Sequence, residues 1–343
     1  MNKFARIPTV LLLFLTFGLS GCLFRSHKVQ QRLSTAQLKT ATQQELIDRL
    51  NGEAAKIKTL NLTVDIATSV GGEKKGKVTD FKEIRGYILV RKPSMLRLVG
   101  LMPIVRNRAF DMVSDGNQFK LWVPATNKFY VGPRDVVYKS PNPLENLRPQ
   151  IFYDALMLRE IDPENEIAVL ESGMETVIDP KSKKQVDQPD YHIDVIRKGP
   201  HGWYLSRKIV FSRVDLQPHE QQIFDTDGNL VTDAKYSELK EYSGITFPTI
   251  IQINRPQEEY SITMTVVKMK LNDPITDEQF ALSQPSGAQI VRLDQPRTTA
   301  KGGDGQSAQQ PANGSQHGDK NKNKKNDKNS GQNGTSAEPK NPR

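Results

Sequence analysis

Alternation of apolar and polar residues constrains the fold of this chain more than any other feature of its sequence. The first clear run alternates apolar residues with polar ones, the apolar members being Leu60, Leu62, Val64 and Ile66. A period of two predicts a strand with one buried face. Gly71-Gly72 breaks this run, and Asp115-Gly116-Asn117 is a hairpin turn signal further along. Closely spaced strands with tight turns predict an antiparallel meander rather than alternating βαβ units.

Further strand-like stretches continue to residue 271, and only a short helix, 150–158, interrupts them. They lie at about 80–90, 95–101, 106–114, 118–123, 128–131, 167–170, 191–197, 204–214, 217–225, 229–242, 246–254 and 261–271. So many strands predict a mainly β fold, a large curled antiparallel sheet that forms an unclosed β-barrel around an apolar cavity. A filled barrel or sandwich with no cavity is the alternative.

One strong helix is predicted before the strands. Thr42 and Glu45 fit the S/T-x-x-E capping box at its start. Its apolar face follows at helical spacing and comprises Leu46, Leu50, Ala54 and Ile57. An amphipathic helix must cover apolar surface, so we expect it to lie as a lid over the cavity of the sheet.

Charge is distributed unevenly along the chain. Of the formal net charge of +9, residues 1–21 carry +2, residues 22–40 carry +4 and residues 297–343 carry +5, which leaves −2 for residues 41–295. The basic balance therefore does not indicate a nucleic-acid-binding domain. Residues 296–343 are rich in Lys, Asn and Gly and have almost no large apolar residue, so we expect a disordered tail.

The first 22 residues have the order of a secretory leader. Lys3 and Arg6 precede an apolar run, which ends in Leu19-Ser20-Gly21-Cys22. The run is too short for a membrane-spanning helix, which needs roughly 20 apolar residues. The tetrapeptide resembles the lipobox of bacterial lipoproteins, which implies a signal peptide at 1–21, lipidation of Cys22 and a tether at 22–40 before a domain at 41–295. An ordinary leader with a chance cysteine is the alternative.

Cys22 is the only cysteine, so no disulfide can form within the folded part. The sequence contains only incomplete versions of known phosphate-binding and metal-binding motifs. Gly71 to Lys77 has the spacing of a phosphate-binding loop, but Val78 replaces the Ser/Thr that would hold magnesium. His192 and Asp194 would share a strand face, without an HExxH motif to support a metal site. We therefore expect no enzyme, no metal and no cofactor.

An apolar loop is the feature that most suggests function. The residues between two predicted strands include Leu101, Met102, Ile104 and Val105, around Pro103. Hairpin loops are normally polar, so this loop either projects toward lipid or a client, or packs into the core as a buried strand end. Pro103 cannot donate a ladder hydrogen bond, which favours an exposed turn and an insertion loop.

Three stretches together resemble the LolA/LolB-like family of bacterial lipoprotein carriers and receptors. They are Gly86 to Leu98 with its Lys92-Pro93 and Arg97, Ala109 to Trp122 around Asp115-Gly116, and Tyr242 to Pro248 followed by Asp277 to Phe280. The resemblance implies an unclosed β-barrel with a helical lid over a cavity for acyl chains. A receptor of this family is itself a lipoprotein, as Cys22 suggests here. The chain departs from the family in its middle, 133–188, and in its long tail.

The sequence therefore predicts an outer-membrane-anchored lipoprotein that faces the periplasm. Its partners would be lipid acyl chains or lipoproteins, bound non-covalently and sorted or inserted at the outer membrane, with a periplasmic carrier protein as a further partner and no nucleic acid. The alternative is a structural or sensor lipoprotein that uses the same fold to bind a protein partner.

Overall fold

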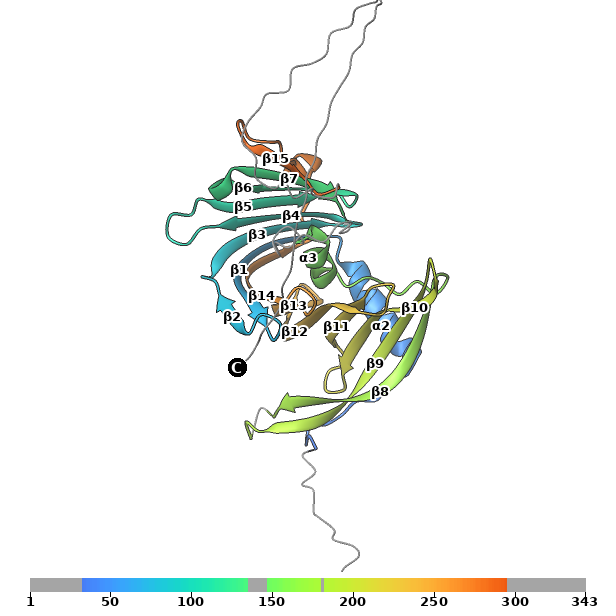
Figure 1. Ribbon diagram of the computed structural model, residues 1–343. Coiled ribbons are helices and arrows are strands. Elements are labelled where there is room, and N and C mark those ends of the chain that lie inside the picture. The colour runs from blue at the N-terminus through green and yellow to red at the C-terminus, as the bar shows by residue number, and fades with distance from the viewer. Residues whose placement is uncertain (1–32, 135–146, 180–181, 295–343) are drawn as a thin grey trace, which may run out of the picture. The chain divides into compact units, whose positions relative to one another are not determined.

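The computed structural model describes residues 33–134, 147–179 and 182–294 (Figure 1). Cys22, the predicted signal peptide and the predicted tail lie outside these residues. Residues 33–40 of the predicted tether lie along the domain, where Ser34 N–H donates to the carbonyl of Asp187 at 2.8 Å and Lys39 N–H to that of Arg213 at 2.7 Å. No helix in the described part of the chain has the length and apolarity needed to span a membrane.

The described residues form fifteen strands of one sheet. The strands are β1 (Thr59–Gly72), β2 (Lys77–Asp80), β3 (Ile84–Arg91), β4 (Met95–Leu101), β5 (Arg108–Ser114), β6 (Gln118–Val123), β7 (Lys128–Pro133), β8 (Glu166–Ile178), β9 (Gln185–Gly199), β10 (Gly202–Ser212), β11 (Pro218–Phe224), β12 (Leu230–Tyr242), β13 (Ile245–Arg255), β14 (Tyr260–Leu271) and β15 (Gln289–Arg292).

The sheet does not close on itself. Its order runs β15-β7-β6-β5-β4-β3-β1-β14-β13-β12-β11-β10-β9-β8, and β2 pairs with the end of β1. All pairs are antiparallel except β15 with β7. The pairing of β1 with β14, in which Leu60 lies opposite Leu271, joins the strands of the two halves of the chain. The mainly β, unclosed antiparallel fold predicted from the sequence is thus confirmed.

Two α-helices pack on one face of this sheet (Figure 1). Helix α2 (Gln43–Lys56) begins at Thr42 with the predicted capping box, in which the Thr42 hydroxyl accepts from Glu45 N–H and the Glu45 carboxylate accepts from Thr42 N–H. Helix α3 (Pro149–Leu156) has proline at its first position, where the missing N–H costs no hydrogen bond. Two short 3-10 helices, η1 (Pro124–Thr126) and η3 (Asp277–Phe280), complete the elements.

Hydrophobic side chains gather in three clusters. The largest surrounds α3 with residues of β1, β3, β4, β6 and β12 to β14, and the second packs Leu46 and Leu50 of α2 on β9 and β10. The third cluster lies on the opposite face of the sheet. Leu89 of β3 packs against this cluster, whereas the adjacent Ile88 and Val90 belong to the first cluster, and successive side chains of a strand point to opposite faces. There Ile275, Phe280 and other residues of the segment after β14 cover β5 and β7.

The sequence prediction missed a long hairpin in the middle of the chain. Strands β8 and β9 pair from Glu166 opposite Arg197 to Ile178 opposite Gln185, where the sequence indicated only 167–170 and 191–197. It also missed β2 and β15, which are four residues long each. The predicted short helix at 150–158 corresponds to α3 and ends earlier.

Candidate functional site

The loop between β4 and β5 projects from the sheet as a tight turn. Met102 N–H donates to the carbonyl of Asn107 at 2.8 Å, and Arg106 N–H donates to that of Met102 at 3.1 Å. The tip lies between these bonds, and Ile104 there is 97 % exposed. Val105 and Met102 are also exposed, whereas Leu101 is half-buried at the end of β4. Three of the four predicted loop residues therefore meet solvent rather than the core.

Ile104 combines exposure with an unfavourable backbone conformation. Its φ is +68°, in the left-handed region. This region is rare for β-branched residues, because their side chain crowds the backbone there. Strained residues of this kind are often found at functional sites. The loop thus holds a fully exposed isoleucine in a position where glycine or asparagine would be more stable.

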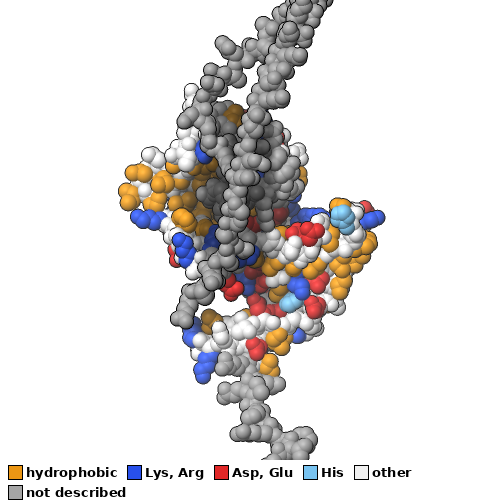
Figure 2. Space-filling view, in the orientation of Figure 1, with side chains coloured by type: hydrophobic (Ala, Val, Ile, Leu, Met, Phe, Trp, Pro, Cys, Tyr) orange, Lys and Arg blue, Asp and Glu red, His pale blue; other side chains and the backbone are white. Residues whose placement is uncertain are grey.

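Other exposed hydrophobic residues lie at the same end of the sheet. Arg85, near the start of β3, pairs with Leu101 at the end of β4, and the link before β3 carries Phe81, which is 57 % exposed. Figure 2 shows hydrophobic side chains gathered at this edge, over the hairpin ends of β3 to β5. We call the three exposed residues Met102, Ile104 and Val105 the apolar loop tip.

The predicted lid face of α2 is buried. Leu46 and Leu50 pack on the second cluster, and Ile57 packs on the first. Leu50, Ala54 and Ile57 face α3 across a small apolar pocket, which Tyr236 and Phe247 also line. The pocket volume is about 60 Å³, whereas sites for drug-sized ligands have about 300–1,000 Å³. Helix α2 therefore closes this space, and an acyl chain enters it only if α2 moves.

A larger and more polar cavity adjoins the apolar pocket. Its volume is about 630 Å³, and α3, the segment 157–160 and strands β9 to β11 provide most of its lining. Met157 and Leu158 line both spaces. Basic residues outnumber acidic ones among the described lining residues, which include Lys92, Arg134, Arg159, Arg197 and Arg207.

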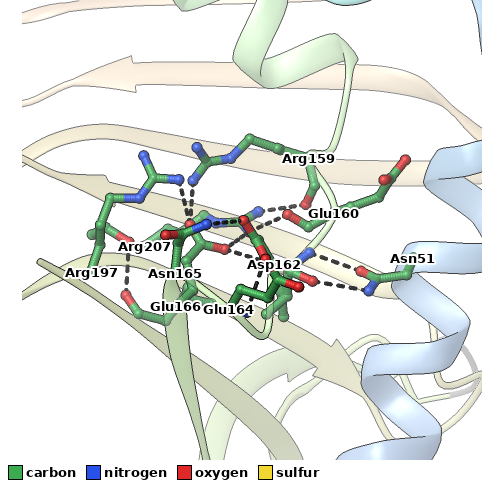
Figure 3. A network of polar contacts seen from close by, with 12 residues as sticks. Asn51, Arg159, Glu160, Asp162, Glu164, Asn165, Glu166, Arg197 and Arg207 are labelled. Atoms are coloured by element: carbon green, nitrogen blue, oxygen red, sulfur yellow. Dashed lines mark hydrogen bonds and ion pairs between the residues drawn. The ribbon is translucent and has the colours of Figure 1, made fainter.

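Three of these arginines converge on one carboxylate, as Figure 3 shows. Glu166 Oε1 lies 2.8 Å from Arg159 Nη2 and 2.6 Å from Arg197 Nη2, and its Oε2 lies 3.2 Å from Arg207 Nη2. The Glu166 side chain is fully buried, and so is almost all of Arg207. Burial raises the pKa of Glu166, but the charge of Arg207, the N–H of Asp162 and the other two arginines outweigh it and hold that pKa below its usual value.

Arg207 also fixes the backbone that leads into β8. Its Nη1 donates to the carbonyl of Arg159 at 2.6 Å and its Nη2 to that of Glu160 at 2.9 Å. From the other side, Asn51 of α2 donates to the carbonyl of Ile161 at 3.1 Å and accepts from its N–H at 2.8 Å. The segment between α3 and β8 is therefore held by both α2 and β10.

Ionisable groups in this cavity are strongly affected by burial. Burial lowers the pKa of Arg207 to about 10. Burial also raises the pKa of Asp154, at the end of α3, to about 6, although Gln150 donates a hydrogen bond to it and the charges of Arg134, Arg159 and Arg207 act in the opposite direction. Asp154 therefore changes charge in mildly acidic solution.

The arginine cluster was missed by the sequence prediction. Arg159, Arg197 and Arg207 come from a loop, β9 and β10, so only strand register brings them together. His192 packs over Gly173, and the described residues contain no group of three potential metal ligands. Cys22, the predicted lipidation site, lies outside the described residues.

Comparison with known proteins gives likenesses in structure. No protein-family model and no curated protein matches the chain. Among solved structures, a LolA superfamily protein from Nitrosomonas europaea has 12% identity and a TM-score of 0.43, and the match covers 69% of this chain and 97% of that one. A DUF1329 family protein from Desulfovibrio piger has 15% identity and a TM-score of 0.46, with 69% and 94% covered.

A third structure is described as an outer membrane lipoprotein-sorting protein domain from Vibrio parahaemolyticus. It has 10% identity and a TM-score of 0.43, with 69% of this chain and 94% of that one covered. We transfer no residue role from these three structures to this chain.

Proposed function

We propose that this protein is a lipid-anchored protein of the cell envelope that binds acyl chains or lipid-bearing clients non-covalently and helps to insert them at the outer membrane. The observation that carries the proposal is Ile104, which is 97 % exposed at the apolar loop tip. The order of the leader and Leu19-Ser20-Gly21-Cys22 supports the anchor at Cys22. The fold and the two helices support a lidded binding site.

The apolar loop tip favours insertion into lipid. Burying the fully exposed Ile104 contributes about 1.5–3 kcal/mol, and the partly exposed Val105 and Met102 add smaller amounts, for a total of roughly a few kcal/mol. The contact is therefore weak enough to be reversible and adds to the membrane affinity of the proposed acyl anchor at Cys22. A reversible contact suits a protein that must reach clients as well as the bilayer.

Helix α2 is suited to act as the lid of the acyl site. Its buried Leu50, Ala54 and Ile57 cover the small apolar pocket beside α3. When α2 moves away, the acyl chain of a client would occupy the position of these side chains. The chain would then cover the apolar pocket surface that α2 had covered. Burial at roughly 25 cal/mol per Å² makes this exchange nearly balanced. The lid therefore opens only when a chain is available.

Insertion can be tested with the full chain and liposomes of phosphatidylglycerol and phosphatidylethanolamine. We expect Ile104→Asp with Val105→Asp to fold normally, because both residues are exposed, and to lose client insertion, measured as transfer of a lipidated peptide into the liposomes. Ile178→Asp is the matched control, since Ile178 is 66 % exposed on β8.

Unchanged transfer in the double variant would refute the insertion role of the loop. Equal losses in the double variant and in Ile178→Asp would also contradict it, because the effect would then come from charge alone. Loss of binding to a protein, with transfer unchanged, would favour the structural or sensor role.

A further inference from the structure

The polar cavity holds more positive charge than its own carboxylates neutralise. Among the described residues, Arg134, Arg159, Arg197 and Arg207 line it, and the carboxylate of Asp154 in the lining and that of Glu166, which contacts three of the arginines, balance two of these four charges. Lys92 and Glu160 pair with each other at 3.0 Å and cancel. The described residues of the cavity therefore carry a surplus of two positive charges at neutral pH.

Two of the arginines that carry this charge are accessible to a ligand, and a third is buried. The side chains of Arg159 and Arg197 are 48 % and 36 % exposed, while that of Arg207 is only 4 % exposed. The partly exposed guanidinium groups of Arg159 and Arg197 line a cavity of about 630 Å³, which has space for an anionic acceptor.

Glu166 aligns the arginines for such an acceptor. It contacts one nitrogen of each guanidinium. An arginine carries five N–H donors in a fixed fork, so within the described part of the chain Glu166 leaves most donors of Arg159 and Arg197 to a second anion. Arginine forks bind carboxylate and phosphate in the same bidentate manner. A phosphate monoester carries between one and two negative charges at neutral pH, which matches a surplus of two.

We propose that this cavity binds the phosphate monoester group of an anionic lipid, with Arg159 and Arg197 as its ligands. The acyl chains of this lipid would pass Met157 and Leu158, which line both the polar cavity and the apolar pocket. The role of the chains rests on the proposed acyl-binding function, whereas phosphate recognition does not. Free phosphate has the same chemistry, and the experiment separates the two sources.

The test uses the full chain in phosphatidylcholine nanodiscs and isothermal titration calorimetry. The probes are dihexanoyl phosphatidic acid, dihexanoyl glycerol, which lacks the phosphate, and inorganic phosphate. Arg159→Gln with Arg197→Gln should weaken binding of the phosphatidic acid roughly tenfold or more, because the charge-assisted hydrogen bonds of both guanidinium groups are lost. Lys198→Gln, at the next position of β9, is exposed and outside the cavity, and should bind like the wild type.

If the double variant binds phosphatidic acid as tightly as the wild type does, the phosphate site is refuted. Binding of dihexanoyl glycerol in the same experiment would still support the acyl site. If phosphatidic acid and free phosphate both bind and both depend on the arginines, while dihexanoyl glycerol does not bind, the phosphate site stands and the acyl function fails. Binding of phosphatidic acid but not of free phosphate identifies the lipid as the source. If the double variant unfolds, Arg197→Gln alone decides, because two arginines still hold Glu166.

Discussion

Arg97 of β4 and Asp111 of β5 form a bidentate ion pair across the two strands that lead to the apolar loop tip. Arg97 Nε lies 3.0 Å from Asp111 Oδ1 and its Nη2 lies 2.8 Å from Oδ2, and the Asp111 side chain is completely buried. Arg97 Nη1 also donates to the carbonyl of Gln279 at 2.9 Å. The pair therefore joins the hairpin of the loop to the segment that covers the third cluster.

We expect Arg97→Gln to lower the free energy of unfolding by about 2–4 kcal/mol, because a buried carboxylate without its partner is strongly destabilising. Arg108, which is 50 % exposed and lies 3.2 Å from Asp111, provides the control. Arg108→Gln should cost less than about 1 kcal/mol, as exposed ion pairs do. Urea unfolding measures both, and equal losses would contradict the special role of Arg97.

Replacing Ile104 by glycine should separate stability from function. Glycine adopts positive φ freely, so we expect Ile104→Gly to raise stability by about 1 kcal/mol, or the melting temperature by roughly 2–4 °C, and to weaken liposome binding. Val105→Gly changes a neighbour that lacks positive φ and should not stabilise. A lower melting temperature in Ile104→Gly would show that the isoleucine side chain makes contacts that outweigh its strain.

Asp154 should make stability depend on pH in mild acid. Its pKa is about 6 in the folded protein and 3.8 ordinarily, so the folded state binds more protons than the unfolded state between these values. Its contribution to stability therefore falls as pH rises through about 4 to 6. Asp154→Asn should match the stability of the wild type below pH 4 and exceed it above pH 6 by about 3 kcal/mol. A stability difference that is the same at pH 4 and pH 7 would rule out this titration.

Lipidation of Cys22 is a separate prediction from the leader sequence. Cys22→Ser should leave the precursor uncleaved or release the protein from the membrane, which detergent partitioning and intact mass would show. A variant with unchanged mass and partitioning would refute acylation at this position. Its folded domain should melt as in the wild type, because the anchor precedes it.

Local sequence patterns predicted the elements that local interactions determine. The capping box at Thr42 and Glu45, the strict alternation of β1 and the Asp115-Gly116 turn each contain their own signal. Only 167–170 of strand β8 was predicted, because β8 pairs on one side only and leaves Ile167 and Val169 exposed by nearly half. An edge strand buries too little for its alternation to show.

The exposed loop could be found from composition, since apolar residues around Pro103 are unusual for a turn. The arginine cluster could not, because it depends on which residues of β9 and β10 lie opposite each other. A shift in register between Leu205 and Arg207 places Arg207 opposite Val195, and a shift of one residue reverses the face of each side chain. Only the folded sheet shows that Arg207 points at Glu166.

The place of β1 in the sheet also determines how the protein must be assembled. Strand β1 pairs on one side with β3, which follows it closely, and on the other with β14, near the end of the domain. One edge of β1 therefore stays unpaired until β14 has emerged, and long-range pairing of this kind is slow and exposes the chain to aggregation. The order of the sheet therefore exposes one edge of β1 to pairing with other chains until β14 is in place.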